Sequence, residues 1–528
     1  VIYLLVKALE TEITMFMIGL LFLLLLSEKL DGLNILAASQ VATKSHKFFM
    51  DAILGSLAEK GHHITVLSPF PSSPKENITE IGFDSLSKMF LVNDWFGDIQ
   101  EERKKVSFSL TPLSDIIDQF MEIIINTTLT DERVKQLFHK KFDLLILDAC
   151  LNEFLLPISV HSNIPTVYIS PVLLFSWVQR TLGATVDYDA YQYVPTDTYF
   201  GRVYNHFITN LHEIDLNYVY YPKMEKLIKD LYPTDYSIPS TDEMVKTVDM
   251  VLVNSHYSMG SGANLPPNII DIGGIHCKGP ANLPLDIEEF ISDGDEGVIL
   301  FSLGSAIPSE QMPKQYLDAF ANAFRRLPQK IIWRWSGEPF ENVPENVMLR
   351  SWLPQQDIAG HPKTRLLISH GGMLSTTEAI CHGIPILGLP FWGDQDANIA
   401  LAVRDGYGLK LEWNDLTEDL LYNTITELLN NTQYTRIVKK RQELFHDRPM
   451  KPLDEAVYWV EHILRHGGGQ HLSPATRNLN RFQAKMLDVY LFLLGAVSII
   501  LILIAGSLYA LLSIVRRFIS PQLKQKLN

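Results

Sequence analysis

Two series of short apolar runs constrain the fold of this chain more than any other feature. The first series occupies 34–39, 64–69, 142–149, 164–170 and 250–255, and the second occupies 298–305, 330–336, 365–372 and 384–390. Between these runs lie segments whose apolar residues have helical spacing, as at 48–60 and 311–327. Strands of a parallel sheet are covered on both faces, so they are apolar throughout, and their crossovers are usually helices. The pattern therefore predicts an α/β fold with two doubly wound sheets.

The stretch 264–284, rich in Pro, Gly and Asn, predicts the boundary between the two sheets. We expect an N-terminal domain at 33–270 and a C-terminal domain at 271–470, facing each other across a cleft. The 528 residues are enough for two such cores.

Two segments are more apolar than a soluble domain needs. Residues 489–515 carry no charge and are long enough to cross a bilayer. Arg516 and Arg517 follow, so the positive-inside rule predicts a cytoplasmic tail at 516–528. The segment before the span, 471–488, is predicted to be a juxtamembrane linker. The run 15–26 predicts a signal peptide within region 1–32, with cleavage between Ser27 and Gly32. A buried first strand is the alternative for that run.

Other features of the sequence agree with a single-pass, type I protein of the endoplasmic reticulum membrane, with its domains in the lumen. Asn77, Asn126 and Asn430 begin Asn-x-Thr triplets, which are candidate N-glycosylation sites. Lys524 and Lys526 resemble a dilysine retrieval signal. The alternative for these lysines is a basic tail beside anionic lipid.

Charge and cysteine content exclude several classes of function. The net charge of −15 argues against a nucleic-acid partner, because phosphate backbones need a basic surface. The three cysteines have neither disulfide-framework nor zinc-site spacing, so we expect no metal.

The segment around Ile368–Gly372 predicts a site for a diphosphate. A buried strand ends at His370, two glycines follow, and a helix is expected to start near Ser375. Gly372 lets the backbone approach a ligand, and the helix start offers N–H donors to an anion. Glu378, one turn later, can accept from two ribose hydroxyls.

Neighbouring residues extend this site. Trp352 could stack on a base or lie in the core, and Gln355 can bond a base or ribose. Asp394 and Gln395 combine an acceptor with an amide, which suits sugar hydroxyls. Gly304 and Ser305 end the first strand of the second series and would bring a second turn to the phosphates.

The run from Trp352 to Gln395 closely resembles the signature of UDP-glycosyltransferases, which include UDP-glucuronosyltransferases, and the resemblance covers nearly the whole chain. It implies a GT-B fold, two Rossmann-like domains with the nucleotide sugar in the C-terminal one. By position, it implies the following roles: uracil stacking for Trp352, nucleoside binding for Gln355, diphosphate binding for His370 and Ser375, ribose binding for Glu378, and sugar binding for Asp394 and Gln395. Leu374 departs from the pattern, because many relatives have an Asn there that touches phosphate or sugar.

The N-terminal domain, which is expected to bind the acceptor, is predicted to hold the general base. His46 follows the first strand and Asp148 ends the strand 142–149, so both lie at the carboxyl edge of one parallel sheet. An imidazole can take a proton from a hydroxyl near neutral pH. The resemblance implies that His46 is the base and Asp148 its partner.

The function expected is inverting transfer of a hexose from a UDP-sugar to a small lipophilic hydroxyl compound, with no cofactor. The variants HGGMLST and PFWGDQ look like the invertebrate branch, which favours UDP-glucose over UDP-glucuronate. Rival hypotheses are a retaining glycosidase and a non-catalytic UDP-sugar-binding membrane protein. The oligomeric state, a homo-oligomer included, stays open.

The aromatic-rich segment 170–221 permits several interpretations. It can be a helical insertion packed on the first domain. It can also form the wall of an apolar pocket, or a surface that dips into the membrane interface.

Overall fold

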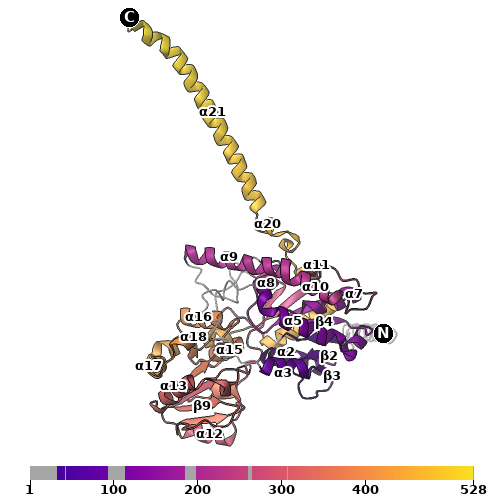
Figure 1. The fold of residues 1–528 in the computed structure, drawn as a ribbon, viewed down its shortest axis with the longest axis vertical. Helices are drawn as coiled ribbons and strands as arrows, with labels where there is room; N and C mark the ends of the chain where they lie inside the picture. The colour runs from indigo at the N-terminus through magenta and orange to yellow at the C-terminus, as the bar shows by residue number, and fades with distance from the viewer. Residues whose placement is uncertain are drawn as a thin grey trace, which may run out of the picture.

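Two parallel sheets form the globular part of the protein (Figure 1). The computed structural model describes residues 32–41, 43–92, 113–184, 198–259, 265–305 and 307–526. The first sheet has the order β3-β2-β1-β4-β5-β6-β7. Its strands are β1 (Asn34–Ala38), β2 (His63–Ser68), β3 (Ile78–Gly82), β4 (Leu144–Asp148), β5 (Thr166–Ser170), β6 (Val248–Val253) and β7 (Ile269–Asp271).

Helices cover both faces of this sheet because alternate strand residues point to opposite sides. Ile35 and Ala37 of β1 pack in the core that holds α2 (Lys44–Glu59). Leu36 and Ala38 pack in the other core. The remaining helices of this part are α3 (Asp84–Val92), α5 (Leu113–Thr130), α6 (Glu132–Leu137), α7 (Leu156–Ser162), α8 (Ser176–Thr181), α9 (Tyr199–Asp215), α10 (Tyr221–Lys229) and α11 (Thr241–Val245), with a π-helical turn, η3 (Leu216–Tyr220), between α9 and α10.

The second sheet has the order β10-β9-β8-β11-β12-β13. Its strands are β8 (Val298–Ser302), β9 (Lys330–Arg334), β10 (Val347–Arg350), β11 (Thr364–Ser369), β12 (Ile386–Gly388) and β13 (Gly408–Lys410). Its helices are α12 (Leu285–Ser292), α13 (Lys314–Arg325), α14 (Gln355–Ala359), α15 (Met373–His382), α16 (Gln395–Arg404), α17 (Glu418–Asn430) and α18 (Thr432–His446). The predicted two-sheet α/β architecture is confirmed.

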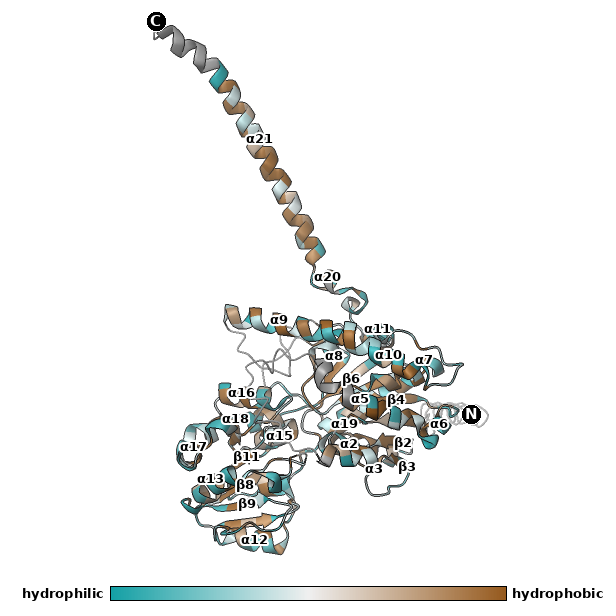
Figure 2. Cartoon of the chain, in the orientation of Figure 1, coloured by the Kyte–Doolittle hydropathy of each residue, from teal (hydrophilic) through white to brown (hydrophobic). Residues whose placement is uncertain are grey.

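Helix α19 (Pro452–His466) returns to the first sheet. Its buried residues Val457 and Val460 share a core with Phe49 and Ile53 of α2, and the two helices lie side by side (Figure 2). The expected C-terminal domain, 271–470, includes this helix, so that part of the chain contributes to both cores. Apolar packing of α19 on α2 therefore ties the two halves together.

The chain ends in one long helix, α21 (Leu487–Lys526), which follows the short α20 (Arg481–Ala484) and projects from the globular part (Figure 1). Within Leu487–Arg517, an 18-residue window has a mean hydropathy of 2.7 and is not buried within the protein. By length and composition it can cross a membrane, and it suggests a single anchor. The predicted signal-peptide run 15–26 lies outside the described residues.

Each sheet has a point at which its strand order reverses, and both points matter for function. In the first sheet the reversal lies between β1 and β4, and in the second between β8 and β11. Loops diverge at the carboxyl ends of such neighbouring strands, which is where open α/β sheets bind ligands. Most of the predicted site residues lie at or beside these two points, whereas Trp352 follows the edge strand β10.

Candidate active site

His46 and Asp148 meet at the reversal point of the first sheet. His46 lies in the first turn of α2, and Asp148 is the last residue of β4. The Nδ1 atom of His46 is 2.8 Å from Oδ2 of Asp148, and Asp148 is 1% exposed. With Nδ1 in this bond, Nε2 is the ring nitrogen that can take a substrate proton.

Asp148 is itself held by groups that the sequence did not single out. The Ser39 hydroxyl donates to its Oδ2 at 3.2 Å, and the Cys150 amide donates to its Oδ1 at 2.9 Å. These two bonds fix the orientation of the carboxylate. Asp148 is thus suited to orient the imidazole and to stabilise its charge after proton transfer.

Asp394, which comes just before α16 of the second half, lies near this pair. Burial lowers the pKa of His46. The charge and hydrogen bond of Asp148, together with the charge of Asp394, raise this pKa by more than burial lowers it, so the net pKa is above its ordinary value. Burial raises the pKa of Asp394, against the lowering effects of its bond from Asn398 and of His46. The structure therefore brings together residues that lie far apart in the sequence.

A hydrogen-bonded cluster forms where the nucleoside was expected. The side-chain amide of Gln355 donates to Oγ of Ser375 at 2.9 Å and to Oε2 of Glu378 at 2.7 Å. The pKa of Glu378 is raised to about 7, because the effect of burial is larger than the opposite effect of the bond from Gln355. Gln355 lies at the start of α14, and Ser375 and Glu378 lie on α15.

Trp352 lies just before this cluster and is 75% exposed. Exposing so large an apolar ring to water is unfavourable unless a ligand covers it. The alternative of a core tryptophan is thereby excluded.

His370 lies between two glycines at the reversal point of the second sheet. A Cβ atom on Gly304 would lie 2.5 Å from its Cε1, and one on Gly372 would lie 2.5 Å from its Nε2. Burial, and then the charge of Arg334, lower the pKa of His370 to about 4. A neutral imidazole is therefore held in a narrow gap, and only glycine fits on either side.

Arg334 was missed from the sequence. It ends β9, and its guanidinium donates to the Gly304 carbonyl. This bond orients the Gly304–Ser305 peptide. The Gly304 N–H, in the preceding peptide, donates to the Ser302 hydroxyl at 3.3 Å. Ser305, predicted to flank the phosphates, is half-buried in the same turn.

Asp394 and Gln395 both lie at the start of α16, but their side chains have different hydrogen-bond partners. Oδ2 of Asp394 accepts from Asn398 at 2.7 Å, and Asn398 also donates to the Gly371 carbonyl at 3.0 Å. Asn398, also missed from the sequence, thus joins Asp394 to the His370–Gly372 turn. Oε1 of Gln395 accepts from the Phe391 amide at 2.8 Å, which leaves its NH₂ for a ligand.

Leu374, which departs from the family pattern, lies at the contact between the two halves. Its side chain packs on the core that contains Phe49 of α2. Its carbonyl accepts from Nε2 of His276 at 3.2 Å. An apolar residue at this position therefore stabilises the contact between the halves.

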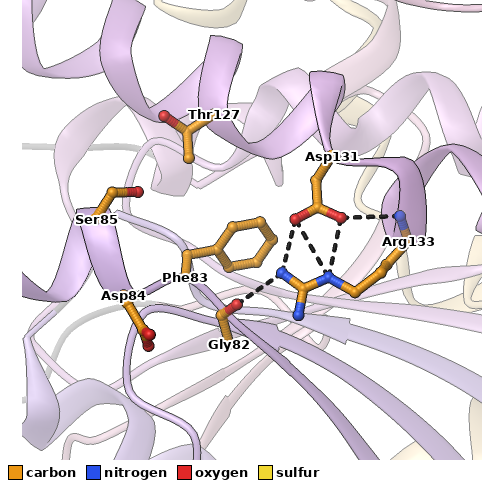
Figure 3. A pocket seen from close by; sticks show the side chains of 7 residues that line it. All are labelled: Gly82, Phe83, Asp84, Ser85, Thr127, Asp131 and Arg133. Carbon is orange, nitrogen blue, oxygen red and sulfur yellow. Dashed lines mark hydrogen bonds and ion pairs between the residues drawn. The ribbon is translucent and has the colours of Figure 1, made fainter.

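The pocket in Figure 3 contains none of the predicted site residues. It lies where the edge strand β3 ends, and it is lined by Gly82, Phe83, Asp84, Ser85, Thr127, Asp131 and Arg133. Arg133 bonds Asp131 and the Gly82 carbonyl there (Figure 3). Its cation is already paired, so this pocket offers little for a charged ligand.

Two solved glycosyltransferases share the fold of this chain. The chain matches the spinosyn forosaminyltransferase SpnP with a TM-score of 0.54 and 16% identity, over 82% of this chain and 99% of that one. It matches CalG4, the calicheamicin glycosyltransferase, with a TM-score of 0.52 and 15% identity over the same shares. These likenesses show the GT-B fold class.

Sequence comparisons identify the family. Residues 36–525 match the model "UDP-glucoronosyl and UDP-glucosyl transferase". UDP-glucosyltransferase 2 of Dactylopius coccus is 34% identical over 90% of this chain and 92% of its own. UDP-glucuronosyltransferase 2B14 of Oryctolagus cuniculus is 33% identical over 87% and 89%. The chain belongs to this family, and it is a UDP-sugar glycosyltransferase.

Proposed function

We propose that this protein transfers a hexose, glucose in preference to glucuronate, from a UDP-sugar to a hydroxyl of a small lipophilic acceptor, with inversion at the anomeric carbon. The observation that carries the proposal is the 2.8 Å bond between His46 and Asp148 beside Asp394. A base with its orienting partner lies on one half, and a residue suited to hold sugar lies on the other.

The reaction follows from this arrangement. Nε2 of His46 takes the acceptor's hydroxyl proton while the oxygen attacks the anomeric carbon. Attack from the side opposite the diphosphate inverts that carbon, and the bond to phosphate breaks with its electrons on UDP. Asp148 stabilises the imidazolium that forms. Holding both substrates in line supplies much of the rate.

The C-terminal half offers a separate group for each part of UDP. The exposed Trp352 ring suits uracil, and the Gln355–Glu378 pair suits the ribose. The buried, neutral His370 and the N-terminus of α15, with the Ser375 hydroxyl, suit the diphosphate, because helix starts bind anions. Asp394 and the free NH₂ of Gln395 suit the sugar hydroxyls.

The preference for glucose rests on charge. Asp394 and Asp148 both act on His46, so the region where the sugar would lie is acidic. A glucuronate carboxylate would be repelled there, whereas glucose is neutral. The printed names of the relatives include both glucosyl- and glucuronosyltransferases, so direct measurement has to decide.

The experiment is a donor competition. Membranes that contain the full chain are incubated with UDP-glucose, UDP-glucuronate and UDP-galactose in turn, each with a panel of phenols. Mass spectrometry identifies the conjugates, and NMR gives the anomeric configuration. We expect β-glucosides from α-linked UDP-glucose. Glucuronides as the main product would overturn the donor assignment, and α-glucosides would overturn inversion.

For the cell, we propose a single-pass type I protein of the endoplasmic reticulum membrane with both sheets in the lumen. The support is the apolar span in α21, followed at once by Arg516 and Arg517.

The candidate sequons differ in accessibility. Asn430 is exposed at the end of α17, Asn126 is half-buried within α5, and the half-buried Asn77 donates to the Ala58 carbonyl. Glycosylation is therefore expected first at Asn430.

A further inference from the structure

Helix α9 has its polar and apolar faces reversed relative to an ordinary surface helix. Its buried side includes Asn205, Thr209, His212 and Glu213. Its outer side carries large apolar residues with high exposure: Tyr199 at 67%, Phe200 at 79%, Val203 at 49%, Phe207 at 58% and Ile214 at 51%. A helix that packs on a protein core and faces water shows the opposite arrangement.

The exposed apolar residues form one stripe. Positions 200, 203, 207 and 214 follow helical spacing, and Tyr218, 77% exposed, continues them into the π-helical turn η3. Single exposed apolar residues need no explanation, but a contiguous stripe marks a surface that something other than water covers. We call this set, Tyr199 to Tyr218, the α9 stripe.

The α9 stripe lies on the side of the molecule from which the apolar span leaves. The segment leading into α20 is fixed to the end of α8, because Thr476 donates to the Gly183 carbonyl at 2.8 Å. Helix α8 in turn contacts α9. In Figure 1, α9 runs along the edge of the globular part nearest α20, crosswise to α21.

We propose that the α9 stripe lies on the bilayer that α21 crosses, as an interfacial helix parallel to the membrane plane. Aromatic residues, tyrosine among them, suit the boundary between headgroups and acyl chains. Helices of this kind bury their apolar face about 5–10 Å into that boundary. The apolar surface continues toward the span through Leu479, Phe482 and Met486, which are 44%, 45% and 52% exposed.

Two contacts with one bilayer would fix the orientation of the globular part. A single helix joined through α20 leaves the domains free to tilt, whereas a second contact along α9 restrains them. The first domain, which holds His46, would then lie close to the lipid in which apolar acceptors partition. The proposal itself concerns α9 and lipid, and it holds or fails independently of the acceptor.

Depth-dependent fluorescence quenching tests the contact. The full chain carrying Phe207→Cys is labelled with an environment-sensitive maleimide and placed in phosphatidylcholine nanodiscs, with nitroxide lipid inside or iodide outside. The unsubstituted chain corrects for labelling of its own cysteines, which are half-buried or buried. Leu285→Cys is the matched control, because Leu285 is 79% exposed on α12, at the opposite end in Figure 1.

We expect nitroxide lipid to quench the label at position 207 several-fold more than the label at 285, and iodide to quench it less. Strong iodide quenching at 207 would overturn the proposal. Shielding from both quenchers would mean that another protein surface, such as a second copy, covers the stripe, and this would overturn it too. Tyr218→Cys repeats the test if Phe207→Cys does not fold.

Discussion

His46 of the first half and Asp394 of the second interact electrostatically across the junction of the two sheets. In the mechanism that we propose, His46 takes the acceptor's proton and Asp394 holds the sugar that the acceptor attacks. Loss of the Asp394 charge would therefore lower the pKa of His46. The same relationship gives the enzyme a pH dependence that can be measured.

The first prediction concerns that pH dependence. His46 acts as a base only when it is deprotonated, so kcat/KM falls as pH drops through its pKa. Asp394→Asn removes a charge that raises this pKa, so the acidic limb moves to lower pH. Asp396→Asn on the same helix is the control, because Asp396 pairs with Lys410. An unmoved limb, or one at higher pH, would contradict the interaction.

The second prediction concerns proton release on donor binding. Burial raises the pKa of Glu378 to about 7, so this carboxyl is partly protonated near neutral pH. Ribose hydroxyls favour the carboxylate, so UDP binding should release protons at pH 7 and tighten as pH rises through that value. Calorimetry in buffers of different ionisation enthalpy measures the release. Glu378→Gln should abolish it, and persistence in that variant would rule out Glu378 as its source.

The third prediction separates a steric clash from backbone strain. Gly304 and Gly393 have φ values of 75° and 69°, but only Gly304 has a ring within contact range of a Cβ. Gly393→Ala should cost the backbone penalty alone, about 1–2 kcal/mol. Gly304→Ala should add overpacking against His370 of about 1–3 kcal/mol and weaken UDP binding. Equal losses of unfolding free energy in the two variants would argue against the narrow gap.

The fourth prediction concerns the exposed ring of Trp352. Base–aromatic stacking is worth about 1–3 kcal/mol, so Trp352→Ala should raise the Kd for UDP by roughly 5- to 150-fold. Because the side chain is 75% exposed, the melting temperature should stay nearly constant. Trp352→Phe should recover most of the affinity. Undiminished UDP binding by the alanine variant would place uracil elsewhere.

The fifth prediction tests the orientation in the membrane. If both sheets lie in the lumen, the exposed Asn430 should carry an N-glycan, so Asn430→Gln should remove one endoglycosidase-sensitive mass step on a gel. Asn77→Gln should change that pattern less, because the Asn77 amide is bonded to Ala58. A full chain without any glycan in a glycosylating host would argue against lumenal domains.

Most strands were predictable because they are buried on both faces, which leaves uninterrupted apolar runs such as 144–147 and 298–301. The short strands β3, β7 and β13 were not predicted, since their residues are partly exposed and mixed in character. In the site, a long contiguous motif pointed to His370, Ser375 and Glu378. Arg334 and Asn398 could not be found in this way, because their roles depend on contacts with residues distant in sequence.

Helix α9 shows a different limit. Its aromatic residues were evident in the sequence, but periodicity cannot say which face of a helix meets the protein. Only the packing of Asn205 and Glu213 inward shows that the aromatic face points outward. The same limit applied to Leu374, whose contact with the opposite half is set by how the two sheets dock.

Turnover of His46→Ala tests the central claim most directly. Transfer from UDP-glucose to a phenol is measured with saturating substrates, and UDP affinity is measured alongside to show that the donor site is intact. Loss of a positioned general base should lower kcat by about 10²–10⁴-fold, with the Kd for UDP unchanged. Turnover equal to that of the unsubstituted chain would contradict proton abstraction by His46.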